Sequence, residues 1–388
     1  MKKLIISAIC LLSFAAGVSS YAYMLKKLIR LLSAASACLI FLFPSCRVEH
    51  GPDLIVIDIS KSRPVFESGA LEESRLIQVS SEVSMGHIQK IQYAGGRFYW
   101  QDNDRHALHV TDTAGHWVKT IDKRGRGAEE YLELSDFFVN ERDASLNLLS
   151  RPDKKHFKYS LDDFSLLGVA RLPKMATSMY PRPGGYVLWM GNYSEDVRHP
   201  DNLWLTDELL KTEVSFLPIH PETESRYSMS SVAFSSLSDT VYYLDNYEQT
   251  VYAVSGRKCV PLWRFESCQE DLSVRRFQAV NGGFCLQVLC QGQYYLVFHD
   301  FHRQSTDVYS LEPCKGRYFH SFGEIVAMDA QGVYCLIDAW SLHRIWEGHD
   351  QYNDFESMFP AQIKRMREDF PEVDSAGNPF LAVYQWNL

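Results

Sequence analysis

The sequence predicts an all-β protein, a six-bladed β-propeller closed by strands from the N- and C-terminal parts of the chain. Short strands of alternating character, separated by turn residues, recur along the 388 residues. The clearest unit, residues 95–140, contains three such strands and a loop that enters a fourth. A unit of this size cannot bury its apolar face alone, so it must stack beside similar units.

Six comparable strand positions define the repeat, namely Tyr99, Leu146, Tyr186, Val241, Phe284 and Ile325. The steps between them are 47, 40, 55, 43 and 41 residues, irregular but within the range of four-stranded propeller blades. Strand and helix signals do not alternate, which disfavours a parallel α/β fold. A β-sandwich is the alternative fold, although a sandwich would not need six similar units.

The predicted strands are bounded by turns rich in Gly, Asn, Asp and Pro, residues that favour chain reversal. In chain order they occupy residues 54–59, 75–79, 87–93, 97–101, 106–110, 117–121, 146–149, 156–159, 166–172, 186–190, 202–206, 212–217, 240–244, 250–254, 261–265, 284–289, 294–298, 306–311, 325–328, 333–337, 343–346 and 378–386.

The C-terminal part contains the one long segment with helical periodicity, Pro360 to Phe370. It places Ile363, Met366 and Phe370 on one face, so we expect a single short helical insertion. The strand that follows it, residues 378–386, comes after an incomplete sixth unit. Propellers finish such a blade with strands from both parts of the chain, which removes open edges. We expect residues 54–59 to be the N-terminal contributor.

Two export-like segments stand in tandem at the start of the sequence. Each has a basic stretch followed by an apolar run, at residues 1–18 and 24–43. Both runs are shorter than the roughly 20 residues that span a bilayer, which disfavours the alternative of a membrane hairpin. We favour Met24 as the genuine start. The expected organisation is a leader at residues 1–46 and a single propeller domain at residues 47–388.

The second apolar run ends in Phe43-Pro44-Ser45-Cys46, which has the small residue before cysteine that is typical of a bacterial lipobox. Cys38 is a weaker candidate, and an ordinary cleaved signal is the alternative. The several acyl chains of a lipoprotein would anchor the protein firmly, whereas one chain binds a membrane only marginally. Lipidation at Cys46 predicts a lipid-anchored protein of the cell envelope, periplasmic or surface-facing.

Composition excludes some classes of function. A net charge of −9 argues against a general nucleic-acid binder. The six cysteines beyond the leader all lie in the C-terminal half and form no C-x-x-C pair, which weakens zinc-binding and thioredoxin-like interpretations. Disulfides and buried free thiols both stay open.

The chain resembles the six-bladed β-propeller lipoproteins common in Bacteroides-type bacteria, which are related to NHL and TolB-like propellers. The resemblance rests on the lipobox-like Cys46, the strand unit at residues 96–121, the loop at residues 124–131 that ends in Glu-Tyr, and the closing strand NPFLAVYQW. The usual Pro-Gly before Glu-Tyr is here Ala128-Glu129. The resemblance implies the propeller fold, and it implies no particular reaction.

The loop from Lys123 to Tyr131 is the best candidate site in the sequence. It concentrates three cationic side chains beside two glycines, whose backbone N–H groups are accessible. Such a loop can bind a carboxylate or an acidic sugar. The candidate ligand-binding residues are Lys123, Arg124, Arg126, Glu129 and Tyr131. The alternative is a plain connection between two blades.

No metal or cofactor is predicted. The pairs His106/His109 and His299/His302 have an offset that places side chains on opposite faces of a strand, so we expect solvated turn histidines. Residues 102–113 begin like a calcium loop but lack its glycine and its final glutamate.

Two functions remain in competition. The first is a binding or scaffolding protein whose ligand is a glycan, a peptide or an outer-membrane partner protein. The alternative is an envelope hydrolase or lyase that acts on glycans or lactones at the channel mouth. Acidic, histidine and arginine side chains gathered from three or more blades would favour the enzyme. Aromatics and amides would favour binding.

Overall fold

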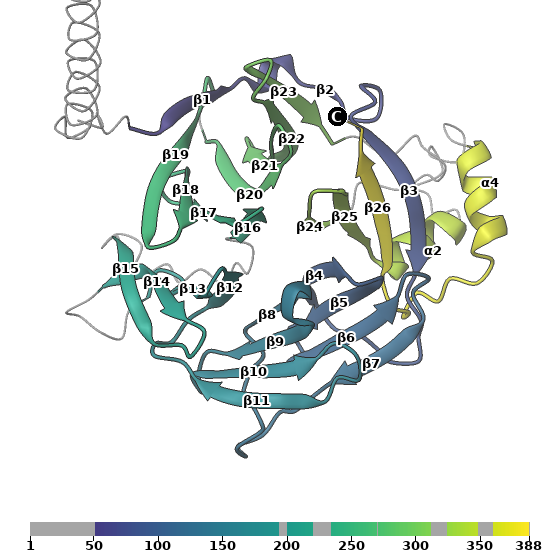
Figure 1. The fold of residues 1–388 in the computed structure, drawn as a ribbon. Coiled ribbons are helices and arrows are strands. Elements are labelled where there is room, and N and C mark those ends of the chain that lie inside the picture. Colours follow the sequence, from purple (N-terminus) through teal and green to yellow (C-terminus); the bar gives the residue numbers. More distant parts are fainter. Residues whose placement is uncertain are drawn as a thin grey trace, which may run out of the picture. The chain divides into compact units, whose positions relative to one another are not determined.

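The structure is a computed structural model that describes residues 51–193, 200–219, 234–269, 271–311, 324–347 and 360–387. Six sheets of four or five strands are arranged in a ring (Figure 1), which confirms the predicted six-bladed propeller. Cys46 and both export-like segments lie outside the described residues. No helix in the described part of the chain is long and apolar enough to cross a membrane.

Each of the first five blades runs from the centre of the ring outward as the chain proceeds. Blade 1 contains β4 (Ile88–Ala94), β5 (Arg97–Asp102), β6 (Ala107–Asp112) and β7 (Trp117–Ile121). Blade 2 contains β8 (Asp136–Asn140), β9 (Ser145–Ser150), β10 (Lys155–Ser160) and β11 (Leu166–Arg171). Blade 3 contains β12 (Ser178–Arg182), β13 (Gly185–Trp189), β14 (Asp201–Asp207) and β15 (Thr212–Pro218).

The second half of the ring follows the same pattern. Blade 4 contains β16 (Phe234–Leu237), β17 (Thr240–Asp245), β18 (Thr250–Ser255) and β19 (Lys258–Ser267). Blade 5 contains β20 (Ser273–Val280), β21 (Gly283–Cys290), β22 (Gln293–Asp300) and β23 (Ser305–Ser310). Blade 6 contains β24 (Glu324–Met328), β25 (Gly332–Ile337), β26 (Phe380–Trp386) and β3 (Leu71–Gln78).

The hydrophobic core lies between the blades. Tyr99 and Leu108 of blade 1 belong to the same buried cluster as Phe137 and Phe157 of blade 2. A middle strand such as β5 is covered on both faces, and therefore five of its six residues are buried. Burial of these faces removes apolar surface from water that no blade could hide alone.

Strands from both parts of the chain close the ring, as predicted, but the N-terminal strand is not the expected one. β3 pairs with β26 in antiparallel register, with Ile77 opposite Leu381. Residues 54–59 were therefore assigned wrongly. Most of them lie in β1 (Asp53–Ile57), which adds in parallel to the outer edge of β19 in blade 4. An apolar run is compatible with any sheet edge, so apolar character alone could not select the edge.

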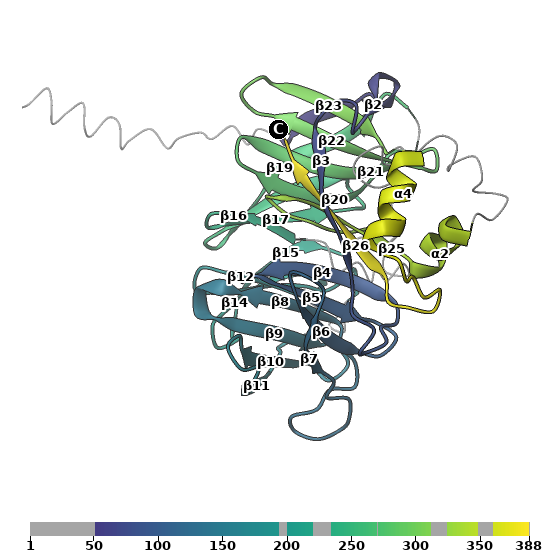
Figure 2. The same ribbon diagram turned by 90° about the vertical axis from the view of Figure 1, so that its right-hand side faces the viewer.

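The segment between β25 and β26 is helical. The predicted helix is confirmed as α4 (Pro360–Asp369), which buries Ile363 and Met366. The predicted strand at residues 343–346 is wrong, because it lies in α2 (Ala339–Glu347). α2 and α4 lie outside the ring beside blade 6 (Figure 2). β26 and β3 supply the third and fourth strands of this blade, so no further strand is needed there.

The histidine expectation was also wrong in part. His109 on β6 and His299 on β22 are buried, rather than solvated in turns. A ring nitrogen of His109 lies 3.3 Å from Asp102 Oδ2, and the other lies 3.2 Å from Thr120 Oγ1. Burial opposes ionisation of Asp102, but hydrogen bonds from His109 and from backbone N–H groups outweigh it and lower the pKa of this carboxyl. These histidines stabilise blades.

Candidate functional site

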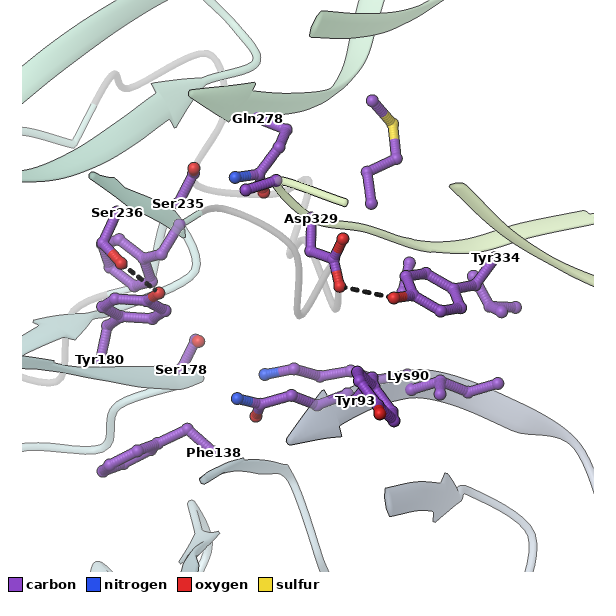
Figure 3. A pocket seen from close by; sticks show the side chains of 17 residues that line it. Lys90, Tyr93, Phe138, Ser178, Tyr180, Ser235, Ser236, Gln278, Asp329 and Tyr334 are labelled. Carbon is purple, nitrogen blue, oxygen red and sulfur yellow. Dashed lines mark hydrogen bonds between the residues drawn. The ribbon is translucent and has the colours of Figure 1, made fainter. Parts of the chain in front are cut away.

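A cavity of about 260 Å³ lies at the centre of the ring (Figure 3). The innermost strands of all six blades, β4, β8, β12, β16, β20 and β24, contribute residues to its wall. The lining residues with charged, polar or aromatic side chains are Lys90, Gln92, Tyr93, Phe138, Ser178, Tyr180, Phe234, Ser235, Ser236, Gln278, Asp329 and Tyr334. We call this cavity the central pocket.

The central pocket is lined mainly by aromatic, amide and hydroxyl groups. Five aromatic rings, two glutamine amides and three serine hydroxyls surround it. Among the residues that the structure describes, no histidine, arginine or glutamate contributes to the wall. Aromatic faces and uncharged hydrogen-bonding groups are suited to holding a polar ring compound.

A buried ion pair joins three blades at the wall of the pocket. Lys90 Nζ donates to Asp136 Oδ1 and to the carbonyl of Phe137, both at 2.7 Å. Asp136 is fully buried and also accepts hydrogen bonds from Ser178 Oγ and, at 3.2 Å, from the Met179 backbone N–H. A lysine ammonium has three donors, and these contacts engage two. The third N–H is therefore available to a ligand in the pocket.

Asp329, which follows β24, is held by donors from its own blade. Its Oδ2 accepts from the Tyr334 hydroxyl at 2.7 Å, and its Oδ1 accepts from the backbone N–H groups of Gln331 and Gly332. Burial, together with the negative charge of Asp329, raises the pKa of Tyr334 well above its usual range. The Tyr334 hydroxyl therefore stays protonated and donates to the carboxylate (Figure 3).

Hydrogen bonds between neighbouring inner strands hold the wall in place. Gln92 of blade 1 accepts from the Val139 N–H of blade 2 at 2.9 Å. The Tyr180 and Ser236 hydroxyls join blades 3 and 4 at 2.9 Å, and Ser235 Oγ accepts from the Ala279 N–H of blade 5 at 3.0 Å. The pocket side chains therefore come from a rigid frame, which reduces the conformational entropy lost when a ligand binds.

The loop predicted as a candidate site, from Lys123 to Tyr131, connects β7 to β8. It is held by hydrogen bonds among its own residues and the end of β7. Tyr131 is buried, and its hydroxyl donates to the Ile121 carbonyl and accepts from the Lys123 N–H. The Gly125 N–H donates to the Tyr131 carbonyl, and the Gly127 N–H donates to the Glu130 carboxylate. Both glycine amides are thus engaged within the loop.

Gly125 packs closely against the end of the Glu130 side chain. A Cβ added there would lie 1.9 Å from Glu130 Oε2. Lys123, Arg124, Arg126 and Glu129 are exposed, and none of them, nor Tyr131, lines the central pocket. An anion site at this loop stays a prediction that depends on the exposed cationic side chains alone.

Sequence reasoning missed the central pocket because three inner strands, β12, β16 and β20, were not predicted. Each is short or polar and immediately precedes a predicted strand. A signal was nevertheless present, because every propeller blade needs an inner strand before its first long apolar strand. Counting four strands per blade would have placed Ser178 and Ser235 near the axis.

Comparison with known proteins agrees with this architecture. A family model described as DUF5128, 6-bladed beta-propeller, matches residues 55–279. A Bacteroides fragilis protein provisionally named as exported has a TM-score of 0.68 at 16% identity, covering 87% of this chain and 100% of that chain. A streptogramin B lyase reaches a TM-score of 0.46 at 9% identity, covering 69% and 82%. No curated protein matches this chain.

Proposed function

The chain belongs to the DUF5128 family of six-bladed β-propellers, and we propose that it is a lipid-anchored binding protein of the cell envelope. The observation that carries this proposal is the central pocket, whose wall combines aromatic rings, amides and hydroxyls from six blades. That lining matches the arrangement expected of a binding site rather than of a hydrolase or lyase.

The ligand that fits best is a small glycan. A volume of about 260 Å³ lies just below the roughly 300–1,000 Å³ of typical small-molecule sites, so one or two sugar rings suffice to fill it. Tyr93 and Tyr180 offer ring faces, while Gln278 and the serines can hydrogen-bond to sugar hydroxyls. The terminal residue of a peptide is the second candidate.

An enzymatic role is less favoured because the two charged side chains in the pocket, Lys90 and Asp329, already take part in hydrogen bonds. Lys90 is paired with Asp136, and Asp329 accepts three hydrogen bonds. A general acid and a general base must both reach the reacting atoms. Asp329 cannot take up a proton without losing contacts that hold the wall, and Lys90 cannot serve as both acid and base.

The envelope location is supported by the tandem export-like segments, the lipobox-like Cys46 and the similarity to a protein provisionally named as exported. Mass spectrometry of the native protein tests it. An acylated N-terminus at Cys46 is expected, whereas an unmodified N-terminus further along the chain would contradict lipid anchoring.

A glycan and peptide binding screen on residues 52–388 tests the role of the pocket. Met328→Trp should fill the pocket from β24 and reduce binding of the best ligand by more than tenfold. Tyr93→Ala should weaken it by removing a ring face. Tyr193→Ala, which removes an exposed aromatic outside the pocket, is the matched control. If the screen gives no ligand, or a ligand unaffected by Met328→Trp, the proposal fails.

A further inference from the structure

The outer edges of the blades differ around the ring, because an additional strand covers some of them and not others. β1 covers β19 of blade 4, and β2 (Arg63–Pro64) covers β23 of blade 5, both as parallel fifth strands. In blades 1, 2, 3 and 6 the outermost strands are β7, β11, β15 and β3, and no described strand pairs with their outer sides (Figure 1). The fold therefore has edges that accept an added strand and edges that remain open.

Among these four open edges, only β11 has no charged residue in its first five positions. β7 contains Lys119 and β15 contains Glu213, and charges of this kind discourage pairing with other chains. The run from Leu166 to Ala170 contains no charged residue that would discourage such pairing. Leu167 is 58% exposed and Val169 is 38% exposed, so this edge presents two apolar side chains to solvent.

A cavity of about 600 Å³ adjoins this edge, between blades 2 and 3. Leu167 and Val169 form one wall, and Leu209, which is 90% exposed in the turn between β14 and β15, belongs to the other side. His156 and Tyr186 line the buried part of the cavity. We call this cavity the lateral socket.

The lateral socket contains the hydroxyl group of Tyr186. Tyr186 is only 8% exposed, and its hydroxyl makes no hydrogen bond with any residue the structure describes. Lys158, Asp143 and Glu208 act on the Tyr186 hydroxyl electrostatically, and the first two form an ion pair of 2.8 Å. Burial lowers the pKa of His156 to about 4, so the imidazole is neutral. The Tyr186 hydroxyl can therefore donate to or accept from an uncharged polar group of a ligand that enters the socket.

We propose that β11 is a docking edge for an extended segment of a partner polypeptide. The segment adds as a fifth strand and places one uncharged hydrogen-bonding side chain in the lateral socket. We infer a polypeptide as the occupant because the chain pairs its own extended segments, β1 and β2, with the corresponding edges of blades 4 and 5. Main-chain hydrogen bonds along β11 give affinity, and the socket gives specificity.

A library of eight-residue peptides, selected on residues 52–388, provides the probe. Hydrogen exchange should show that the selected peptides protect backbone amides at residues 166–171. Val169→Lys should weaken binding by more than tenfold. The matched control is Val118→Lys on β7, an equally exposed valine on another open edge, and it should bind like the parent. Circular dichroism confirms that each variant is folded.

Tyr186→Phe separates the socket from the edge. It removes one hydroxyl and should weaken peptides with a central Asn, Gln, Ser or Thr by up to tenfold, the effect of one hydrogen bond. Peptides with Ala at that position should be unaffected. Met328→Trp in the central pocket should leave the binding of peptides that depend on Val169 unchanged, so failure of this proposal and failure of the central-pocket proposal are distinguishable.

Three results would overturn the docking edge. The first is a library that yields no peptide whose binding depends on Val169. The second is protection of amides elsewhere than in β11. The third is a self-association of the parent, detected by sedimentation, that Val169→Lys abolishes, because the occupant would then be a second copy of this chain.

Discussion

Arg142 of blade 2 donates from Nη2 to Asp239 Oδ1 of blade 4 at 3.0 Å, although blade 3 lies between these blades in the ring. The same guanidinium donates to the Ser238 carbonyl at 3.1 Å. Both side chains belong to turns that follow inner strands, β8 and β16. The charge of Arg142 also acts on Tyr180, which lines the central pocket. The pair therefore joins non-adjacent blades at the end of the pocket.

This contact should contribute little to stability despite its position. Its side chains are 64% and 76% exposed, and exposed ion pairs typically contribute about 0–1 kcal/mol. A double-mutant cycle of Arg142→Ala and Asp239→Ala, measured by urea unfolding, should give a coupling energy below about 1 kcal/mol. A coupling above about 2 kcal/mol would show that the pair holds the ring together.

The ion pair of Lys90 with Asp136, unlike that of Arg142 with Asp239, should be important for stability. Lys90→Met leaves the fully buried Asp136 without its cationic partner, and loss of one member of a buried pair costs about 3–5 kcal/mol. Urea unfolding measures the loss. Lys61→Met, which removes an 80% exposed lysine from its pair with Asp58, is the matched control and should change the unfolding free energy by less than about 1 kcal/mol. Equal effects of the two substitutions would contradict this account.

Closure of the ring depends on the start of β26. Phe380 is 1% exposed and packs edge-on against Phe370, the residue after α4, with ring centroids 5.4 Å apart. Phe380→Ala should destabilise the protein by about 3–5 kcal/mol, the usual range for a buried phenylalanine. Phe380→Leu should cost clearly less because it leaves a smaller cavity. A loss below about 1 kcal/mol for the alanine variant would mean that the closing strand is not held by this contact.

The sequence predicted the middle strands of the blades, but it did not predict which strands pair at their outer edges. Middle strands such as β5 and β21 are continuous or alternating apolar runs between clear turns, and these local signals predicted them. The partner of β26 could not be predicted in this way, because pairing across three hundred residues depends on ring geometry. α2 was missed because the short stretch at residues 343–346 contains two apolar residues, Ile345 and Trp346, which a strand would also accommodate.

The central pocket shows a second limit of sequence reasoning. Its residues lie on six separate strands, and no pair of them forms a motif in the sequence. The loop at Lys123, in contrast, was conspicuous because its charges and glycines are contiguous. The structure accounts for those glycines through packing against Glu130 and for the Glu-Tyr ending through the buried Tyr131. Residues that are contiguous in a loop are thus easier to recognise from the sequence than a pocket assembled from six strands.

His156 predicts how stability depends on pH. It is 5% exposed on β10, and burial, followed by the charge of Lys158, lowers its pKa from 6.5 to about 4. Between these values the unfolded chain binds a proton that the folded protein does not bind. The contribution of the neutral His156 to the free energy of unfolding is therefore fully present above pH 6.5, and it is lost as the pH falls toward 4. At pH 5 the expected loss is about 2 kcal/mol relative to pH 7.5.

His156→Gln tests this dependence, because glutamine does not titrate and can still donate to the Asn147 side chain that lies 2.9 Å from His156 Nε2. Urea unfolding of parent and variant at pH 7.5 and at pH 5 separates the effect of the proton from any difference in packing. The parent should lose about 2 kcal/mol more than the variant between the two conditions. His116→Gln, at an exposed histidine, is the control and should retain the parent's pH dependence at His156. Parallel losses in the parent and in His156→Gln would mean that His156 accepts a proton in the folded state as readily as in the unfolded chain.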